Sequence, residues 1–345
     1  MQIGLAHAET IPSLNSRELT EAISTVPFDL PAIGLSLLAG FDQSLTIELV
    51  IAPATVTEPE VSVSFDGLTG TLLANADQSA EVQMLMGSFS AEESSSGMGF
   101  TLEGMNLESQ LSRMNDLLAP SEALLTIPAI SSNGPLAFAA SDISASSNLT
   151  TATNSSDQVD VRQRLIIANI DSELPLQSVT WTLEINELAT ELVRSYYELL
   201  GTMQEQLSSS ATAPDTALDE LGEKMLLLLV QNSLVFNNYL NATLFEGEHS
   251  LDILVRWLGL PQTAAVDELA IANIFSAMQL DIDLSMDLEA VMRSPLSGLV
   301  DPYVQQGYIT LDNGRVLLDL SLNDSELTIN GERTSLEQFF PSQNL

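Results

Sequence analysis

The amino-acid sequence predicts an α+β fold that is mainly antiparallel β-sheet, with amphipathic helices concentrated in the second half and a C-terminal β-meander. The first observation is that apolar and polar residues alternate in many short segments, which is typical of strands with one buried face. The second is that Asn313-Gly314 and Asn323-Asp324 separate C-terminal runs of strand length. Asn-Gly accepts positive φ at both central positions of a type I′ turn, so these runs are expected to pair as hairpins.

The first half of the chain carries the clearest strand patterns. In residues 45–51, Leu and Ile at the odd positions alternate with Thr, Glu and Val at the even positions, so one face is apolar. Residues 61–65 repeat the pattern. Gly67 and Gly70 indicate a turn or bulge before the chain returns through residues 82–86. Further strands are predicted at residues 100–107, 161–170, 181–185, 251–257 and 278–286, and the meander at 308–311, 315–322 and 326–329.

Helical periodicity is concentrated in the second half. Asn186 is predicted to cap a helix that runs from Glu187 to about Gln206. Pro295 is expected to break the last helical pattern. The other helices are predicted at residues 215–230, 267–277 and 288–306, and a Ser/Thr/Asn-rich surface loop at 141–157.

These elements predict four parts. Residues 1–40 form an N-terminal segment with a leader remnant and a short helix, and residues 41–207 a β-rich half. A Ser-rich linker at 208–216 then leads to an α+β half, residues 217–345, which ends in the three-stranded meander. Ile3 to Ala8 is similar to the end of an apolar stretch with a small-x-small processing site, without a basic region before it. A trimmed leader and a disordered N-terminus are the two interpretations.

The charge of the chain excludes several classes of partner. The net charge is −37, from 47 acidic and 10 basic residues, and Lys224 is the only lysine. Such a field repels phosphate backbones and anionic lipid surfaces, so no nucleic-acid partner is expected. The chain has no cysteine, which excludes disulfides, thiolate nucleophiles and cysteine zinc sites. No run reaches the roughly 18–20 apolar residues of a transmembrane helix, so no transmembrane segment is expected.

Three segments carry a resemblance to a known family. They are similar to motifs of the YdgA-like family of bacterial envelope proteins, whose function is unknown. The segments are FDGLTGTL at residues 65–72, FTLEGMNLES at 100–109 and GYITLDNGRVLLDLSLNDSELTING at 307–331. The resemblance covers roughly residues 60–335 and implies an exported protein, periplasmic or extracellular, that is membrane-anchored in its precursor. Two features depart from the family pattern, since no N-terminal membrane anchor is expected from these residues and lysine is almost absent.

Few residues suggest catalytic or metal chemistry. A Ser-His-Asp triad would depend on His249, which has Glu246 and Glu248 beside it, whereas a solvated turn histidine explains the same pattern. Asp281, Asp283 and Asp287 would project from one face of a strand and are weak candidates for calcium binding, although an acidic solvent face has the same spacing. No nucleophile elbow, zinc-protease motif or phosphate loop is present. The sequence therefore predicts neither an enzyme nor a cofactor.

The apolar faces of the predicted strands lead to three functional hypotheses. Ordinary helices or a second sheet would cover these faces, whereas an open groove lined by Met84, Met86, Met278 and Met286 would suit an acyl chain or a partner strand. The first hypothesis is a non-catalytic envelope or extracellular protein that self-assembles, or binds another envelope protein, through sheet edges. The second is a periplasmic carrier of lipid or another hydrophobic ligand. The third is a hydrolase that uses His249.

Overall fold

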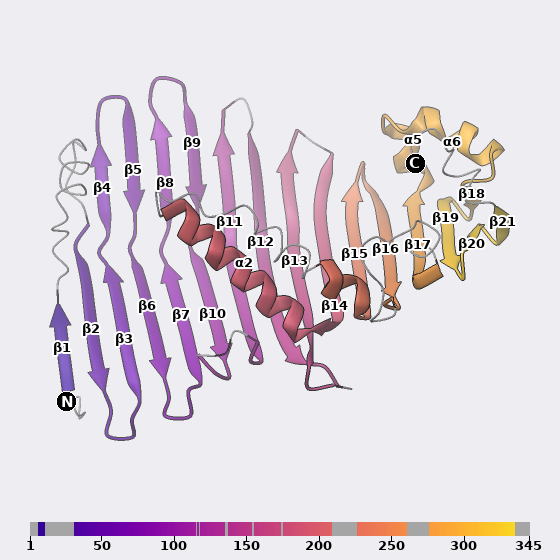
Figure 1. The fold of residues 1–345 in the computed structure, drawn as a ribbon. Coiled ribbons are helices and arrows are strands. Elements are labelled where there is room, and N and C mark those ends of the chain that lie inside the picture. Colours follow the sequence, from indigo (N-terminus) through magenta and orange to yellow (C-terminus); the bar gives the residue numbers. More distant parts are fainter. Residues whose placement is uncertain are drawn as a thin grey trace. The chain divides into compact units, whose positions relative to one another are not determined.

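The computed structural model describes residues 6–10, 31–114, 116, 118–134, 137–153, 155–173, 175–208, 226–260 and 276–334 (Figure 1). The described strands pair antiparallel, and the described helices include α2 (Thr190–Ser208), α5 (Leu288–Arg293) and α6 (Ser297–Gln305). The protein is therefore mostly antiparallel β-sheet, more β-rich than the predicted α+β class. The chain divides into two compact units, residues 1–148 with 164–178 and residues 149–163 with 179–345.

Unit 1 is built from antiparallel strands that form two rows. β1 pairs with β2, β2 with β3, β3 with β6, β6 with β7, β7 with β10 and β10 with β11. A second row runs β4, β5, β8, β9, β11. The strands are β1 (Ala6–Thr10), β2 (Ile33–Ala39), β3 (Leu45–Ile51), β4 (Ala54–Thr57), β5 (Val61–Phe65), β6 (Leu68–Ala74), β7 (Ala80–Met86), β8 (Phe89–Glu93), β9 (Met98–Leu102), β10 (Met105–Leu111) and β11 (Ser121–Asn133).

Gly67 lies where the chain passes from the second row of unit 1, at β5, to the first row, at β6. It lies between β5 and β6 with φ +97°, a conformation that favours glycine. A Cβ at this position would lie 2.9 Å from the carbonyl oxygen of Ile51. The predicted turn or bulge is thus a break after which the chain pairs with new neighbours.

Two predictions about local structure were wrong. The expected loop at 141–157 is mostly strand, because β12 (Phe138–Thr151) covers most of it and β13 (Gln158–Ser172) begins directly after it; its threonines favour a pleated backbone. The helix predicted from Glu187 begins only at Thr190. In the predicted N-terminal segment, residues 6–10 and 33–39 are strands, and residues 1–5 and 11–30 lie outside the described part of the chain.

The late start of α2 has a visible cause. β14 (Leu176–Ala189) continues through Asn186, so that residue does not cap the helix. Glu187 has φ +63°, which is incompatible with a right-handed helix. Its N–H donates to Asp160 Oδ1 at 2.9 Å, and this bond fixes the backbone in the strand.

Unit 2 contains the predicted C-terminal meander. β15 (Leu234–Leu244), β16 (Gly247–Trp257), β17 (Met278–Asp287), β19 (Arg315–Asn323), β20 (Glu326–Ile329) and β21 (Glu332–Thr334) pair in that order, and β18 (Thr310–Asp312) pairs with β19. Asn313 and Asp324 have positive φ, as the hairpin prediction required. The predicted break at Pro295 is confirmed, because Pro295 lies between α5 and α6.

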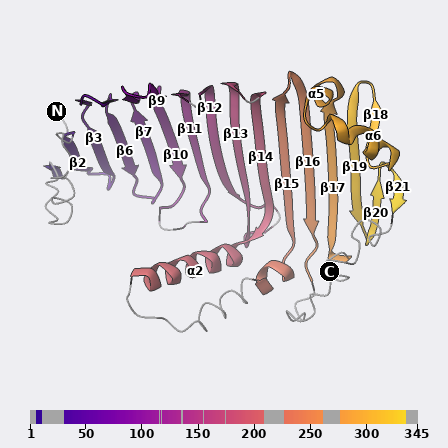
Figure 2. The ribbon, with the colours of Figure 1, turned by 90° about the horizontal axis from the view of Figure 1, so that it is seen from above.

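Helices α5 and α6 provide the second layer of unit 2 at one end of β17 and β19 (Figure 2). Val291, Val300 and Val316 form a buried cluster there, with Met286 and Val304 packed against it. A second cluster joins β19 and β20 through Leu320, Leu322, Leu327 and Ile329.

Other predicted segments lie largely outside the described residues. These are residues 209–216 of the linker, and most of the helices expected at 215–230 and 267–277. Residues 226–231 and 276–277 are described and are helical.

Candidate functional site

The strand register of unit 2 separates an apolar face from an acidic face. Leu240, Leu251, Leu284 and Leu318 lie directly opposite one another across β15, β16, β17 and β19. Side chains alternate between faces along each strand, so the neighbouring row belongs to the other face. That row consists of Tyr239, Asp252, Asp283 and Asp319.

The apolar face holds a cavity of about 340 Å³ between the β15–β16 hairpin and α5. Its floor is formed by β15, β16 and β17, and its wall by α5 and the turn that follows. Nearly all of its lining surface is apolar. The lining residues are Leu240, Ala242, Leu244, Phe245, His249, Ser250, Leu251, Leu284, Met286, Ala290, Val291, Ser294, Pro295 and Leu296.

One wall of this cavity is a strained hairpin turn. Phe245 and Glu246 connect β15 to β16 with φ +52° and +62°. A two-residue hairpin requires such values, but Asn and Gly accept them far more readily than Phe or Glu. Residues held in this region cost on the order of 1–3 kcal/mol each and persist only where the surroundings fix them.

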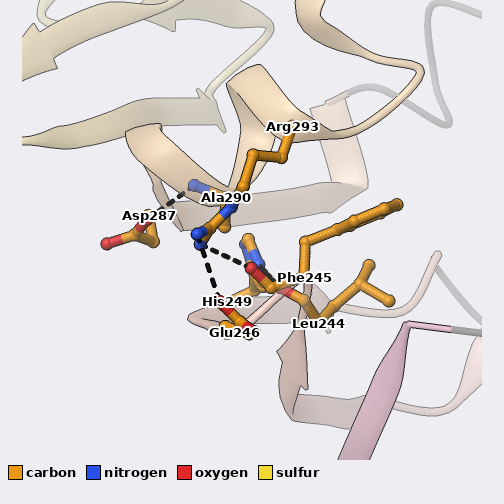
Figure 3. Close-up of polar contacts among 7 residues, drawn as sticks. All are labelled: Leu244, Phe245, Glu246, His249, Asp287, Ala290 and Arg293. Carbon is orange, nitrogen blue, oxygen red and sulfur yellow. Dashed lines mark hydrogen bonds and ion pairs between the residues drawn. The ribbon is translucent and has the colours of Figure 1, made fainter.

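Arg293 of α5 is what fixes the turn (Figure 3). Its Nη2 donates to the carbonyl oxygen of Phe245 at 2.7 Å, and its Nη1 donates to Glu246 Oε2 at 3.2 Å. The Nε2–H of His249 donates to the carbonyl oxygen of Leu244 at 2.9 Å. We call these four residues, Phe245, Glu246, His249 and Arg293, the clamped turn.

Two short contacts position α5 against the sheet. Asp287 caps the helix by accepting a hydrogen bond from the N–H of Ala290 at 2.8 Å. Gly247 lies so close to the helix that a Cβ there would be 2.4 Å from Ala290 Cβ and 2.8 Å from Asp287 Cβ. Only glycine therefore allows α5 to approach the hairpin at this distance.

Two polar lining residues of the cavity, His249 and Ser294, have backbone partners. Ser294 Oγ donates to the carbonyl oxygen of Val291 at 2.7 Å and accepts from the N–H of Leu296 at 3.1 Å. His249 donates to Leu244, as described above. The cavity is suited to hydrocarbon, because burying apolar surface stabilises a complex while a polar ligand atom would lose its hydration there.

The opposite face of the same sheet carries an acidic groove of about 410 Å³. Asp252, Asp283 and Asp319 line it beside Tyr239. Burial raises the pKa of Asp252, and the neighbouring Asp283 raises it further. Burial also raises the pKa of the Tyr239 hydroxyl, with Asp252 and Glu184 adding to the shift and Arg162 opposing it.

The predicted metal candidates do not converge on one point. Asp281 lies opposite Leu254 and Ser321, whereas Asp283 lies opposite Asp252 and Asp319. Asp287 caps α5. Within the described ranges, no group of three or more His, Asp or Glu side chains is arranged to hold a metal ion.

The structure also places the residues that the hydrolase hypothesis would use. His249 is partly buried near the start of β16 and bonds to a backbone carbonyl, while Glu246 pairs with Arg293. Sequence reasoning missed Phe245, Arg293 and the small residues Ala242 and Ala290. The Phe-Glu pair has no turn signature, and a lone arginine on a short helix indicates no partner.

The predicted methionine lining is divided between the two units. Met286 lines the cavity, and Met278 packs against the meander core. Met84 and Met86 lie on the apolar face of unit 1, where Leu49, Gly70, Met84 and Leu107 form one cross-strand row. Leu49, Met84 and Leu107 are only half-buried.

Comparison with known proteins identifies the family. The model of a family described as "Bacterial protein of unknown function (DUF945)" matches residues 2–337. The chain belongs to the DUF945 family. The YdgA-like resemblance is consistent with DUF945, and that finer naming stays a prediction. No curated protein and no solved structure gives a significant match. Among the described helices of this DUF945 protein, none is long and apolar enough to cross a bilayer.

Proposed function

We propose that this DUF945 protein is a non-catalytic carrier that binds a hydrophobic ligand in the apolar cavity of unit 2. The observation that carries the proposal is the nearly complete apolar lining of a cavity of about 340 Å³. Small-molecule sites are mostly apolar and span roughly 300–1,000 Å³. Met286 gives the lining an adaptable side chain, which suits acyl chains of differing shape.

The proposal includes the compartment that the YdgA-like resemblance implies. An exported protein, periplasmic or extracellular, would meet hydrophobic ligands derived from the envelope. The net charge of −37 supports transport through water, because a strongly charged surface keeps a protein with exposed apolar patches soluble. Fractionation of the native host, with detection of the protein in periplasm, medium and cytoplasm, tests this part.

A cavity-filling variant tests ligand binding. Ala242→Phe adds a ring in the cavity, so we expect it to weaken binding of the neutral fluorophore N-phenyl-1-naphthylamine at least about tenfold, or 1.4 kcal/mol. Asn241→Phe is the matched control, because it adds a ring to the same strand on the acidic face. Leu296→Gln changes an exposed residue at the cavity and is expected to weaken binding without affecting folding.

Native mass spectrometry of protein purified without detergent complements the fluorescence titration. We expect adducts of acyl-chain mass on the wild type, and we expect Ala242→Phe to lack them. Equal affinity of the wild type, Ala242→Phe and Leu296→Gln for the fluorophore would overturn the carrier proposal.

Association through unit 1 is a second candidate. β1 pairs with β2, and β4 pairs with β5, and neither has a second neighbour among the described pairings. An unpaired strand edge can add a strand from another copy or from another envelope protein. Light scattering tests this candidate. Discrete multimers without adducts would support it, and added salt should favour them because it screens the acidic charge. A monomer at all salt concentrations would contradict self-assembly.

A further inference from the structure

We propose that the cavity of unit 2 selects a ligand without a negative charge, because Glu246 neutralises Arg293 within the clamped turn. This inference rests on the proposed carrier function and adds the chemical class of the ligand. Carriers of fatty acids or phospholipids pair an anionic head group with a free cation. Arg293 is the arginine bonded to the turn that lines this cavity, so its partners bear on whether an anion is accepted.

Two of the five N–H donors of Arg293 are committed to the turn, one from each terminal nitrogen. Both terminal nitrogens bond to the turn, Nη1 to Glu246 and Nη2 to the carbonyl oxygen of Phe245. Releasing them would leave Phe245 and Glu246 in the left-handed region without the contact that fixes them. An anionic head group would have to compete with both the Glu246 carboxylate and the strain of the turn.

The lining residues His249 and Ser294 do not offer an anion a hydrogen-bond donor that is free of a backbone partner. His249 and Ser294 spend their donors on the carbonyl oxygens of Leu244 and Val291. Glu248 and Glu289 are exposed in the elements that flank the cavity, and they add to the negative field of the chain. A charge that is buried without a partner costs far more than hydrocarbon of the same size, so the ligand that fits is an uncharged hydrophobic molecule.

Two fluorophores with the same ring system provide the test. N-phenyl-1-naphthylamine is neutral, and 8-anilinonaphthalene-1-sulfonate adds one sulfonate. In the full-length wild type we expect the neutral probe to bind at least about tenfold more tightly, a difference of 1.4 kcal/mol. Affinities are measured by fluorescence titration at two ionic strengths, because the contribution of the surface charge falls with added salt.

Glu246→Gln tests the role of the clamp. It removes the carboxylate that pairs with Arg293, and we expect the affinity ratio of anionic to neutral probe to rise about two- to fivefold, the range of exposed ion pairs. Glu326→Gln is the matched control, since it frees Arg333 from an exposed ion pair at the β20–β21 hairpin with the same change in charge. Its probe ratio should equal that of the wild type.

The outcomes separate this inference from the carrier proposal. Equal binding of both probes by the wild type, or an unchanged ratio in Glu246→Gln, would overturn the selection against anions and leave a carrier of broader specificity. A neutral probe whose binding is insensitive to Ala242→Phe would overturn the carrier function itself, and this inference with it.

Discussion

The apolar faces of the two units look alike in sequence and differ in burial. In unit 2, Leu320, Leu322 and Leu327 are only 2–6% exposed. In unit 1, Leu49, Leu72 and Leu107 occupy the same kind of position and are only partly buried. Alternation of apolar and polar residues therefore predicts a strand with one apolar face. Whether that face is buried depends on which other elements of the chain pack against it.

Helices account for one of the two buried clusters of unit 2, whereas Leu320 and its cluster are packed against strand residues such as Leu280 and Ile282. α5 and α6 pack beside β17 and β19 and bury Val316 completely. The described part of unit 1 contains strands and no helix of its own. Its buried apolar residues are few and mostly alanines, such as Ala74 and Ala80. Extended apolar surface that stays accessible is typical of interaction sites, and this is the basis for proposing association through unit 1.

Truncation of one leucine in each unit should break or confirm this comparison. Leu322→Ala is expected to lower the free energy of unfolding by about 2–5 kcal/mol, because it leaves a cavity in a packed cluster. Leu72→Ala should cost only about 1 kcal/mol, since its side chain remains partly in water. Urea unfolding followed by circular dichroism and by tryptophan fluorescence measures both. Equal losses would mean that the face of unit 1 is packed as tightly as that of unit 2.

The attachment of α5 provides a sharper test of how unit 2 covers its sheet. Asp287→Ala removes the cap of a six-residue helix, and such losses cost about 0.5–2 kcal/mol. A helix this short has no stability of its own, so we also expect faster amide exchange at Val291. Asp281→Ala is the matched control, because Asp281 lies on the same face of β17 without capping a helix. Similar effects of the two variants would show that α5 is held by other contacts.

The strands and turns of the meander were predictable because their signals are local. Asn313-Gly314 specifies a hairpin by its own backbone preferences, and Pro295 ends a helix through its ring and missing N–H. The start of α2 was not predictable in this way. It depends on Asp160, distant in sequence, which holds Glu187 in a left-handed conformation.

The candidate site was harder to predict than the fold. Met286 was expected in an apolar lining on the basis of its strand pattern, and it lies there. The clamped turn carries no turn signature, because Phe245 and Glu246 are held in place by Arg293, which lies 47 positions beyond Glu246. The close approach of Gly247 to Ala290 is likewise a tertiary contact. Local propensity contains no information on such contacts.

The polar faces of the two units also differ, in how they space their carboxylates. On unit 1, Glu81 lies between Leu73 and Gln110 in the cross-strand row. On unit 2, Asp252 lies directly opposite Asp283, which lies directly opposite Asp319. Like charges placed opposite one another destabilise a sheet by roughly 0.2–1 kcal/mol. The acidic groove therefore reduces the stability of unit 2 at neutral pH.

Asp252→Asn should remove part of this cost. Burial and Asp283 raise the pKa of Asp252 above 3.8, so the protonated carboxyl favours the folded state. The stabilisation from protonation is complete below 3.8 and is lost as the pH rises through the raised value. At pH 7 the variant should therefore be more stable by about 0.2–1 kcal/mol, and this advantage should disappear in acid. Glu81→Gln is the control, because Glu81 has no like-charged neighbour directly opposite, and it should show neither effect in urea unfolding. If Glu81→Gln raised the free energy of unfolding as much as Asp252→Asn, overall charge and not the aspartate row would limit stability.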